Sequence, residues 1–186
     1  MSTQPHAVKP LLRRPLDILL IAFYAISATY GLLFSLPEAL GIPVSADSPW
    51  PPLRMLYDWS IAEEPTQLLT PLPVFLRSAT IMDGFIHSPF LLVLIYALVK
   101  GRNWIRPWAI LFAGSSVTNM HYYFMHTLLS DTPPPNTAYY LAFNLPWMLM
   151  PMLLAWRMWK PNPFGVLGGV ERGTTGASHA GVGQPA

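Results

Sequence analysis

The chain has 186 residues, of which 52% are hydrophobic and only 11% are charged. Because about a quarter of the residues in a soluble domain are charged, this composition favours a membrane protein, and the length suits one domain. The formal net charge of +2 is too small to predict nucleic-acid binding. The sequence contains no cysteine, which excludes disulfides and thiolate metal sites.

Four apolar segments follow one another along the chain, over about residues 15–36, 73–99, 107–129 and 137–159. Each exceeds the roughly 20 residues that a helix needs to cross the hydrocarbon core of a bilayer. The sequence therefore predicts an all-α membrane protein, a bundle of four transmembrane helices.

The membrane domain is expected to cover residues 13–160. The flanking segments 1–12 and 161–186 lack an apolar face and are predicted to be disordered. In the proline-rich loop between the first two apolar segments, residues 53–59 have two interpretations. They form either a short interfacial helix or an ordinary loop whose aromatic side chains anchor it at the headgroups.

Lysine and arginine are distributed unevenly between the two ends of the predicted bundle. One end holds Lys9, Arg13, Arg14, Lys100, Arg102, Arg106, Arg157 and Lys160. The loops at the other end hold only Arg54 and Arg77 among several acidic residues. By the positive-inside rule, both termini are expected to face the cytosol.

Asp83 lies in the middle of the second apolar segment, and His87 follows one helical turn later. A carboxylate at the centre of a membrane helix costs about 2.5–3.5 kcal/mol on insertion scales, so it persists where it faces protein, water or a ligand. The alternative is a static pair of Asp83 with His87 or Asn119. Asp83 and His87 are the only titratable side chains that we place deep in the bundle.

Polar side chains on the other predicted helices recur at helical spacing and at similar depth. They form three stripes: Thr80, Asp83 and His87; Ser116, Asn119, Tyr123 and His126; Tyr140, Asn144, Trp147 and Pro151. Residues spaced in this way share one helix face, which predicts that the stripes meet inside the bundle. Asn119 also fits a purely structural interhelical hydrogen bond, and Trp147 fits ordinary packing.

Other chemistries are not favoured by the sequence. The membrane histidines His87, His121 and His126 do not have the spacing of a metal site. No glycine-rich phosphate loop and no nucleophile elbow is present, so no cofactor is expected.

Four local patterns lie in a fixed order along the chain: Leu53-Arg54 with Trp59 and Glu64-Pro65; Asp83 with His87-Ser88-Pro89; Lys100-Gly101 with Trp104-Ile105-Arg106; and Pro146-Trp147 with Pro151. Together they resemble the EXPERA-domain family of four-helix membrane proteins, most closely its sigma-2 receptor branch, which is related to the emopamil-binding sterol isomerases.

This resemblance implies a multi-pass protein of the endoplasmic reticulum with a pocket that opens sideways to the membrane. It implies a role in sterol homeostasis or trafficking. The expected partners are a sterol or other amphiphilic lipid or amine, the membrane, and a second copy of the chain in a homodimer. The expected ligand contacts are Tyr30, Glu38, Glu64, Asp83, His87, Asn119, Asn144 and Trp147.

The alternative implied by the resemblance is a sterol or terpenoid isomerase or cyclase in which Asp83 and His87 are the catalytic pair. This chain departs from both branches. The receptor branch has a second acid on its first helix, and the nearest match in this chain is Ser35, with Glu38 three residues later. The isomerases have a catalytic acid on the third helix, where this chain offers Ser116 and Asn119. We therefore favour a noncatalytic binding protein.

Overall fold

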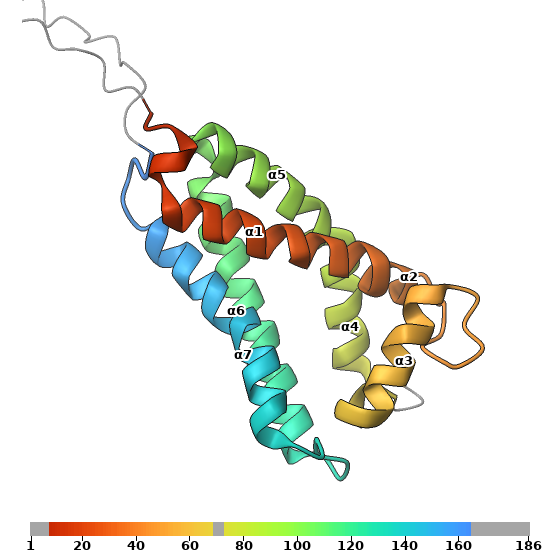
Figure 1. The fold of residues 1–186 in the computed structure, drawn as a ribbon. Helices are drawn as coiled ribbons and strands as arrows, with labels where there is room; N and C mark the ends of the chain where they lie inside the picture. Colours follow the sequence, from red (N-terminus) through yellow and green to blue (C-terminus); the bar gives the residue numbers. More distant parts are fainter. Residues whose placement is uncertain (1–7, 69–72, 165–186) are drawn as a thin grey trace, which may run out of the picture.

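The computed structural model describes residues 8–68 and 73–164, and all regular structure within them is helical (Figure 1). The α-helices are α1 (Pro15–Tyr30), α2 (Leu36–Ala39), α3 (Pro51–Glu63), α4 (Val74–Met82), α5 (Ser88–Lys100), α6 (Arg106–Leu129) and α7 (Thr137–Arg157). Two π-helical turns, η2 (Gly31–Ser35) and η4 (Asp83–His87), connect α1 to α2 and α4 to α5. Three short 3₁₀ turns complete the set: η1 (Leu11–Arg13), η3 (Pro65–Leu68) and η5 (Asn103–Ile105).

The helix ends follow local chemistry. α1 and α3 begin with proline, whose missing N–H is not needed in a first turn. α5 ends at Lys100, and the residue that follows, Gly101, adopts the left-handed conformation with φ of 62°. α7 is capped by Asn136, whose side chain accepts a hydrogen bond from the backbone N–H of Tyr139 at 3.0 Å. The open question about residues 53–59 is settled in favour of a helix, because they lie within α3.

The two π turns occupy equivalent positions before a proline. η2 ends two residues before Pro37, and η4 ends two residues before Pro89. A proline ring clashes with the carbonyl four residues back, and a π turn widens the helix by bonding five residues back instead. The N–H and the hydroxyl of Ser88 both donate to the carbonyl of Asp83, the hydroxyl at 2.8 Å.

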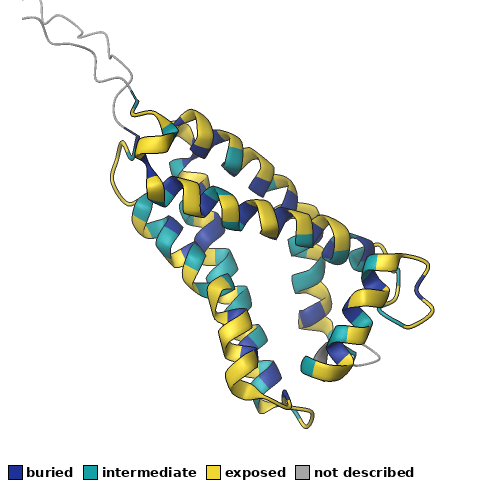
Figure 2. Ribbon diagram, in the orientation of Figure 1, coloured by how far each residue is buried: buried dark blue, intermediate teal, exposed yellow. Residues whose placement is uncertain are grey.

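The helices pack in two pairs, with α1 beside α5 and α6 beside α7 (Figure 1). A cluster of buried hydrophobic residues lies toward the end where the chain enters and leaves the bundle. It includes Leu20, Leu94, Leu98, Leu154 and Met158, none of which is exposed to solvent. At the opposite end α4 and α6 diverge (Figure 1), and α3 packs against η2. The outer faces expose many large apolar side chains (Figure 2), as expected for helices in contact with lipid.

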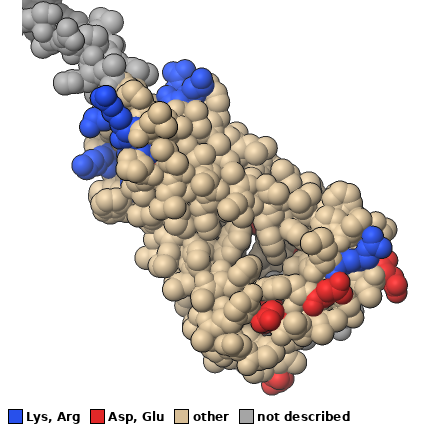
Figure 3. All heavy atoms as spheres, in the orientation of Figure 1, with Lys and Arg blue, Asp and Glu red and all other residues tan. Residues whose placement is uncertain are grey.

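Within the described residues, three helical segments are long and apolar enough to cross a membrane: Pro15–Ala39, Val74–Lys100 and Thr137–Arg157. The membrane class and all-helical architecture predicted from the sequence are therefore confirmed. α6 has 24 residues but is not one of the three, because its polar stripe lowers its mean hydropathy. In Figure 3, most of the visible lysine and arginine lies at the end where the termini leave, and the visible acidic residues lie at the other.

Two glycines allow η2 and η4 to approach each other. A Cβ atom on Gly84 would lie 2.8 Å from Cα of Leu36, and one on Gly31 would lie 1.8 Å from Oγ of Ser88. Since the neighbour of Gly84 is backbone, it cannot move aside independently. Close contact of these two turns therefore depends on the absence of a side chain at position 84.

We expect Gly84→Ala to lower the free energy of unfolding by about 1–3 kcal/mol, because the added methyl group overpacks the contact with Leu36. Gly114→Ala is the matched control, since a Cβ atom there meets nothing within 4 Å. It should be neutral or stabilising by up to about 1 kcal/mol. Thermal unfolding of both variants in the same detergent measures the difference, and equal stability would contradict the close contact of η2 and η4.

Candidate ligand-binding cavity

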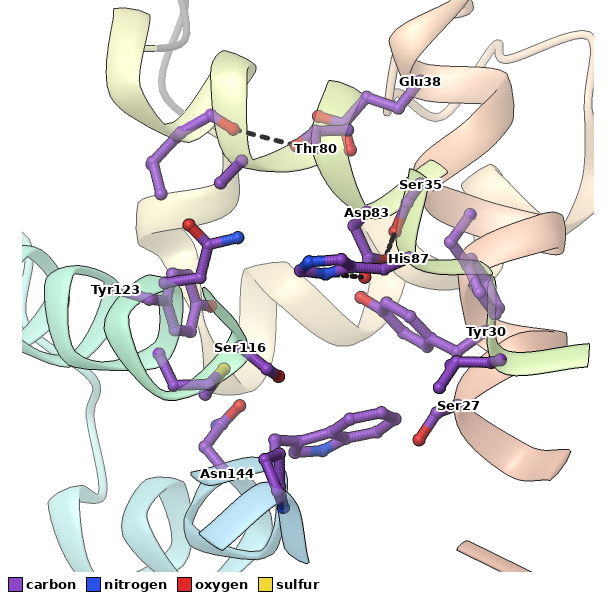
Figure 4. A pocket seen from close by; sticks show the side chains of 18 of the residues that line it. Ser27, Tyr30, Ser35, Glu38, Thr80, Asp83, His87, Ser116, Tyr123 and Asn144 are labelled. Atoms are coloured by element: carbon purple, nitrogen blue, oxygen red, sulfur yellow. Dashed lines mark hydrogen bonds and ion pairs between the residues drawn. The ribbon is translucent and has the colours of Figure 1, made fainter. Parts of the chain in front are cut away.

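A cavity of about 540 Å³ lies between the helices and reaches α3 (Figure 4). The space-filling view shows a hollow on the face turned to the reader (Figure 3). All eight of the sequence-predicted contact residues line the cavity: Tyr30, Glu38, Glu64, Asp83, His87, Asn119, Asn144 and Trp147. The predicted convergence of three polar stripes is confirmed except for Tyr140 and His126, which do not line it. The role of the eight residues as ligand contacts stays a prediction.

Asp83 is one of three acidic residues that line the cavity, with Glu38 and Glu64. Its side chain is 37% exposed and stands on the π turn η4. The hydroxyl of Ser35, on the facing turn η2, donates to Oδ2 of Asp83 at 2.6 Å. Oδ1 lies 3.6 Å from Nδ1 of His87 (Figure 4). The carboxylate is therefore held by one strong hydrogen bond and keeps one oxygen next to the imidazole.

His87 also lines the cavity, and its side chain is only 7% exposed. Its Nε2 lies 3.1 Å from Oγ of Ser115 on α6, within hydrogen-bond distance. Its ring packs edge-on against the ring of Phe112, with centroids 5.0 Å apart. A row of polar groups thus runs from Ser35 through Asp83 and His87 to Ser115, joining three helical segments.

An aromatic wall from α1, η2 and α7 forms part of the lining. The ring centroid of Trp147 lies 5.2 Å from that of Phe23 and 5.6 Å from that of Tyr30. Tyr30 in turn contacts Phe34 at 4.8 Å. The faces of such rings attract cations and also pack well against fused apolar rings.

Glu64 closes the cavity from the end of α3. It is 1% exposed and accepts a hydrogen bond from the hydroxyl of Tyr123. Burial raises the pKa of Glu64 from 4.5 to about 7, although the hydrogen bond from Tyr123 acts in the opposite direction. The protonated form of Glu64 is therefore favoured by folding.

Because the pKa of Glu64 is higher in the folded state, its contribution to stability is complete below about pH 4.5 and is lost as the pH rises through about 7. We expect the free energy of unfolding to fall by about 2–3 kcal/mol across this range. Glu64→Gln should remove this part of the pH dependence, because the amide keeps the shape and cannot ionise. Denaturant midpoints of both proteins between pH 5 and pH 8 make the measurement, and parallel profiles would contradict the burial of Glu64.

A second buried polar cluster lies outside the cavity, near the start of α1. Asp17, which is fully buried, accepts hydrogen bonds from Arg14 at 2.9 Å and from Arg157 at 2.8 and 3.1 Å. Arg14 also donates to the carbonyls of Leu98 and Val99 at the end of α5. The cluster therefore ties α1, α5 and α7 together, and its position gives it a structural role.

Two features of the site were not predicted from the sequence. One is the burial of Asp17 at the start of α1 and of Glu64 after α3, where the sequence had singled out Asp83 and His87 as the titratable residues deep in the bundle. Ser115, the partner of His87, was missed because the stripe beginning at Ser116 occupies the neighbouring face of α6. The sequence signal that could have identified Ser115 is its position one residue before that stripe, on the face of α6 that is turned to the adjacent helix.

The arrangement suits recognition of an amphiphile. Its acid and imidazole provide polar and ionic contacts, and its aromatic wall provides apolar area. Among the described residues, no three side chains of the histidine, aspartate and glutamate type are grouped as a metal would require.

The family model described as EXPERA (EXPanded EBP superfamily) matches residues 52–158, which is more than half of the chain. No curated protein matches the chain. The matched segment contains α3 to α7 and therefore most of the helices around the cavity. The chain belongs to the EXPERA family of membrane proteins.

Proposed function

We propose that the protein binds a sterol or another amphiphilic lipid or amine in the cavity between its membrane helices, as in the sigma-2 receptor branch of the family. The observation that carries this proposal is the half-open carboxylate of Asp83 in a cavity with an aromatic wall. A carboxylate in apolar surroundings is destabilised unless a cation or hydrogen-bond donor faces it. The hydroxyl of Ser35 supplies one donor, and the polar end of a ligand supplies the next.

The size and lining of the cavity agree with such a ligand. A volume of about 540 Å³ lies in the ordinary range of small-molecule sites, about 300–1,000 Å³. The aromatic rings of Phe23, Tyr30 and Trp147 provide a surface for fused rings or for a substituted ammonium group. A ligand with one polar end and a rigid apolar body satisfies both parts of the lining.

We further propose that α6 crosses the membrane beside α7, giving four crossings with both termini in the cytosol. With 24 residues α6 is about 36 Å long, enough for the hydrocarbon core. It packs along α7, and its polar residues Ser116 and Asn119 line the cavity (Figure 1). The endoplasmic reticulum, and a role in sterol homeostasis or trafficking, follow from the receptor-like assignment.

Topology gives a direct test of this arrangement. Tags at either terminus should be cleaved by protease added to intact microsomes, because the basic end of the bundle faces the cytosol. A glycosylation site introduced next to Asp47, in the loop before α3, should be used by the lumenal machinery. Protection of a C-terminal tag would contradict the proposed crossing of all four helices.

The second candidate function is an isomerase or cyclase acting on a sterol or terpenoid. The observation in its favour is that Asp83 and His87, which are 3.6 Å apart, line one cavity with the ring of Trp147. Expression in sterol-isomerase-deficient yeast tests this function. Growth that requires both Asp83 and His87 would establish an isomerase activity. Failure to restore growth is the result expected of a noncatalytic binding protein.

The binding proposal is tested by mass spectrometry of lipids that remain with the protein after purification in mild detergent. One amphiphile class should be enriched over its share of the host membrane. An unrelated four-helix membrane protein purified in the same way is the control. A lipid profile identical to that of the control would contradict the proposal.

A further inference from the structure

The two oxygens of the Asp83 carboxylate have different neighbours. Oδ2 accepts the short hydrogen bond from Ser35, at 2.6 Å. Oδ1 lies 3.6 Å from Nδ1 of His87, which is too long for a strong hydrogen bond and close enough for an ion pair. The carboxylate is 37% exposed and the imidazole 7% exposed, and both side chains line the cavity.

Histidine is the side chain whose charge ordinarily changes between about pH 5 and pH 8. A protonated His87 would donate from both ring nitrogens, toward Asp83 and toward Ser115. A neutral His87 that accepts at Nε2 from the hydroxyl of Ser115 carries its proton on Nδ1, next to Asp83, without neutralising the carboxylate.

The two protonation states of His87 depend mainly on its pairing with Asp83, because its direct neighbours on α6 do not ionise. On α6 it meets the hydroxyl of Ser115 and the ring of Phe112, neither of which changes charge in this range. On the facing η2–α2 segment, the hydroxyl of Ser35 donates a hydrogen bond to Asp83, and Glu38 lines the same cavity.

Four further ionisable side chains line the cavity. They are Glu64, which accepts a hydrogen bond from Tyr123, and the phenols of Tyr24, Tyr30 and Tyr123. Glu38 and Glu64 are the groups that compete with His87 as sources of pH dependence, and the test must separate them from it.

We infer that a proton on His87 determines the charge of the ligand that the cavity accepts. When His87 is protonated, it pairs with Asp83 and the two are together neutral, which removes the attraction for a cationic amphiphile and leaves an uncharged one unaffected. When His87 is neutral, the carboxylate carries a net negative charge and attracts a cationic amphiphile. This inference rests on the proposed binding function and adds a selectivity that changes with pH.

The test compares two probes of equal alkyl length, a quaternary ammonium amphiphile and the matching alcohol. The charge of neither probe changes with pH. Their affinities are measured with the full-length protein in lipid nanodiscs at about pH 8 and about pH 5.5, on either side of the ordinary titration of histidine. We expect the ammonium probe to bind at least about tenfold more weakly at the lower pH, because its cation then competes with a charged imidazole. The affinity of the alcohol should stay constant.

Variants assign the proton to one residue. In His87→Gln, or in His87→Asn if the first variant does not fold, the affinity for the ammonium probe should no longer depend on pH. His121→Gln is the matched control, because His121 does not line the cavity, and it should keep the wild-type dependence.

The outcomes separate this inference from the proposed function. Ammonium binding that is lost in Asp83→Asn but does not depend on pH in the wild type would retain the binding function and overturn the role of His87. A pH dependence that persists without His87 would also overturn it and assign the proton to a carboxyl group of the cavity, namely Glu38, Glu64 or Asp83 itself. The absence of saturable binding of either probe at both pH values would contradict the proposed function itself.

Discussion

Asp83→Asn is expected to weaken the binding of cationic amphiphiles by roughly 10- to 100-fold, because it removes the charge from a partly exposed carboxylate that lines the cavity. The amide oxygen can still accept the hydrogen bond from Ser35, so the contact between η2 and η4 should persist. Titration with a labelled amine measures the loss of affinity. Thermal unfolding should show that the variant still folds.

Asp131→Asn is the matched control for this effect. Asp131 is exposed, lies in the loop between α6 and α7, and does not line the cavity. Its replacement removes the same charge from the protein and should leave the affinity unchanged. Equal losses in both variants would point to the net charge of the protein, and unchanged affinity in Asp83→Asn would reject Asp83 as a ligand group.

The largest expected effect on stability comes from Asp17→Asn. Asp17 is fully buried and receives hydrogen bonds from both Arg14 and Arg157. Removing the acid leaves two buried or half-buried guanidinium groups without a counter-charge. Breaking a buried pair in this way typically lowers the free energy of unfolding by about 3–5 kcal/mol.

The measurement is the denaturant or thermal midpoint of Asp17→Asn, with Asp58→Asn as control. Asp58 is exposed on α3, and its replacement should change the stability by less than about 0.5 kcal/mol. A loss of binding without a loss of stability in Asp17→Asn would contradict the structural role of the cluster, since Asp17 does not line the cavity.

Much of the architecture was predictable because a membrane imposes simple rules on a sequence. Length and apolar composition located the helices to within about three residues at most ends, as the match between the predicted 137–159 and the observed Thr137–Arg157 illustrates. The helical period placed Asp83, Asn119 and Trp147 on inward faces, and all three line one cavity.

The remaining features depend on pairings between distant parts of the chain. Asp17 and Arg157 are 140 positions apart, and no local pattern connects them. The π turn η4 adds a residue to its helix, and the contact that it makes with η2 depends on Gly31 and Gly84 fitting against each other's segments. Ser115 becomes a partner of His87 only because the packing of α6 turns this residue toward η4.

Photoaffinity labelling in native membranes tests the central claim most directly, because it reports where an amphiphile lies in the protein. A photoactivatable sterol and a photoactivatable amphiphilic amine are crosslinked to the full-length chain, and the labelled peptides are sequenced. Labels should concentrate on cavity residues such as Tyr30, Met120 and Trp147, and excess unlabelled ligand should displace them. Labels that resist competition and lie on outward-facing residues such as Leu111 and Trp156 would contradict a binding site between the helices.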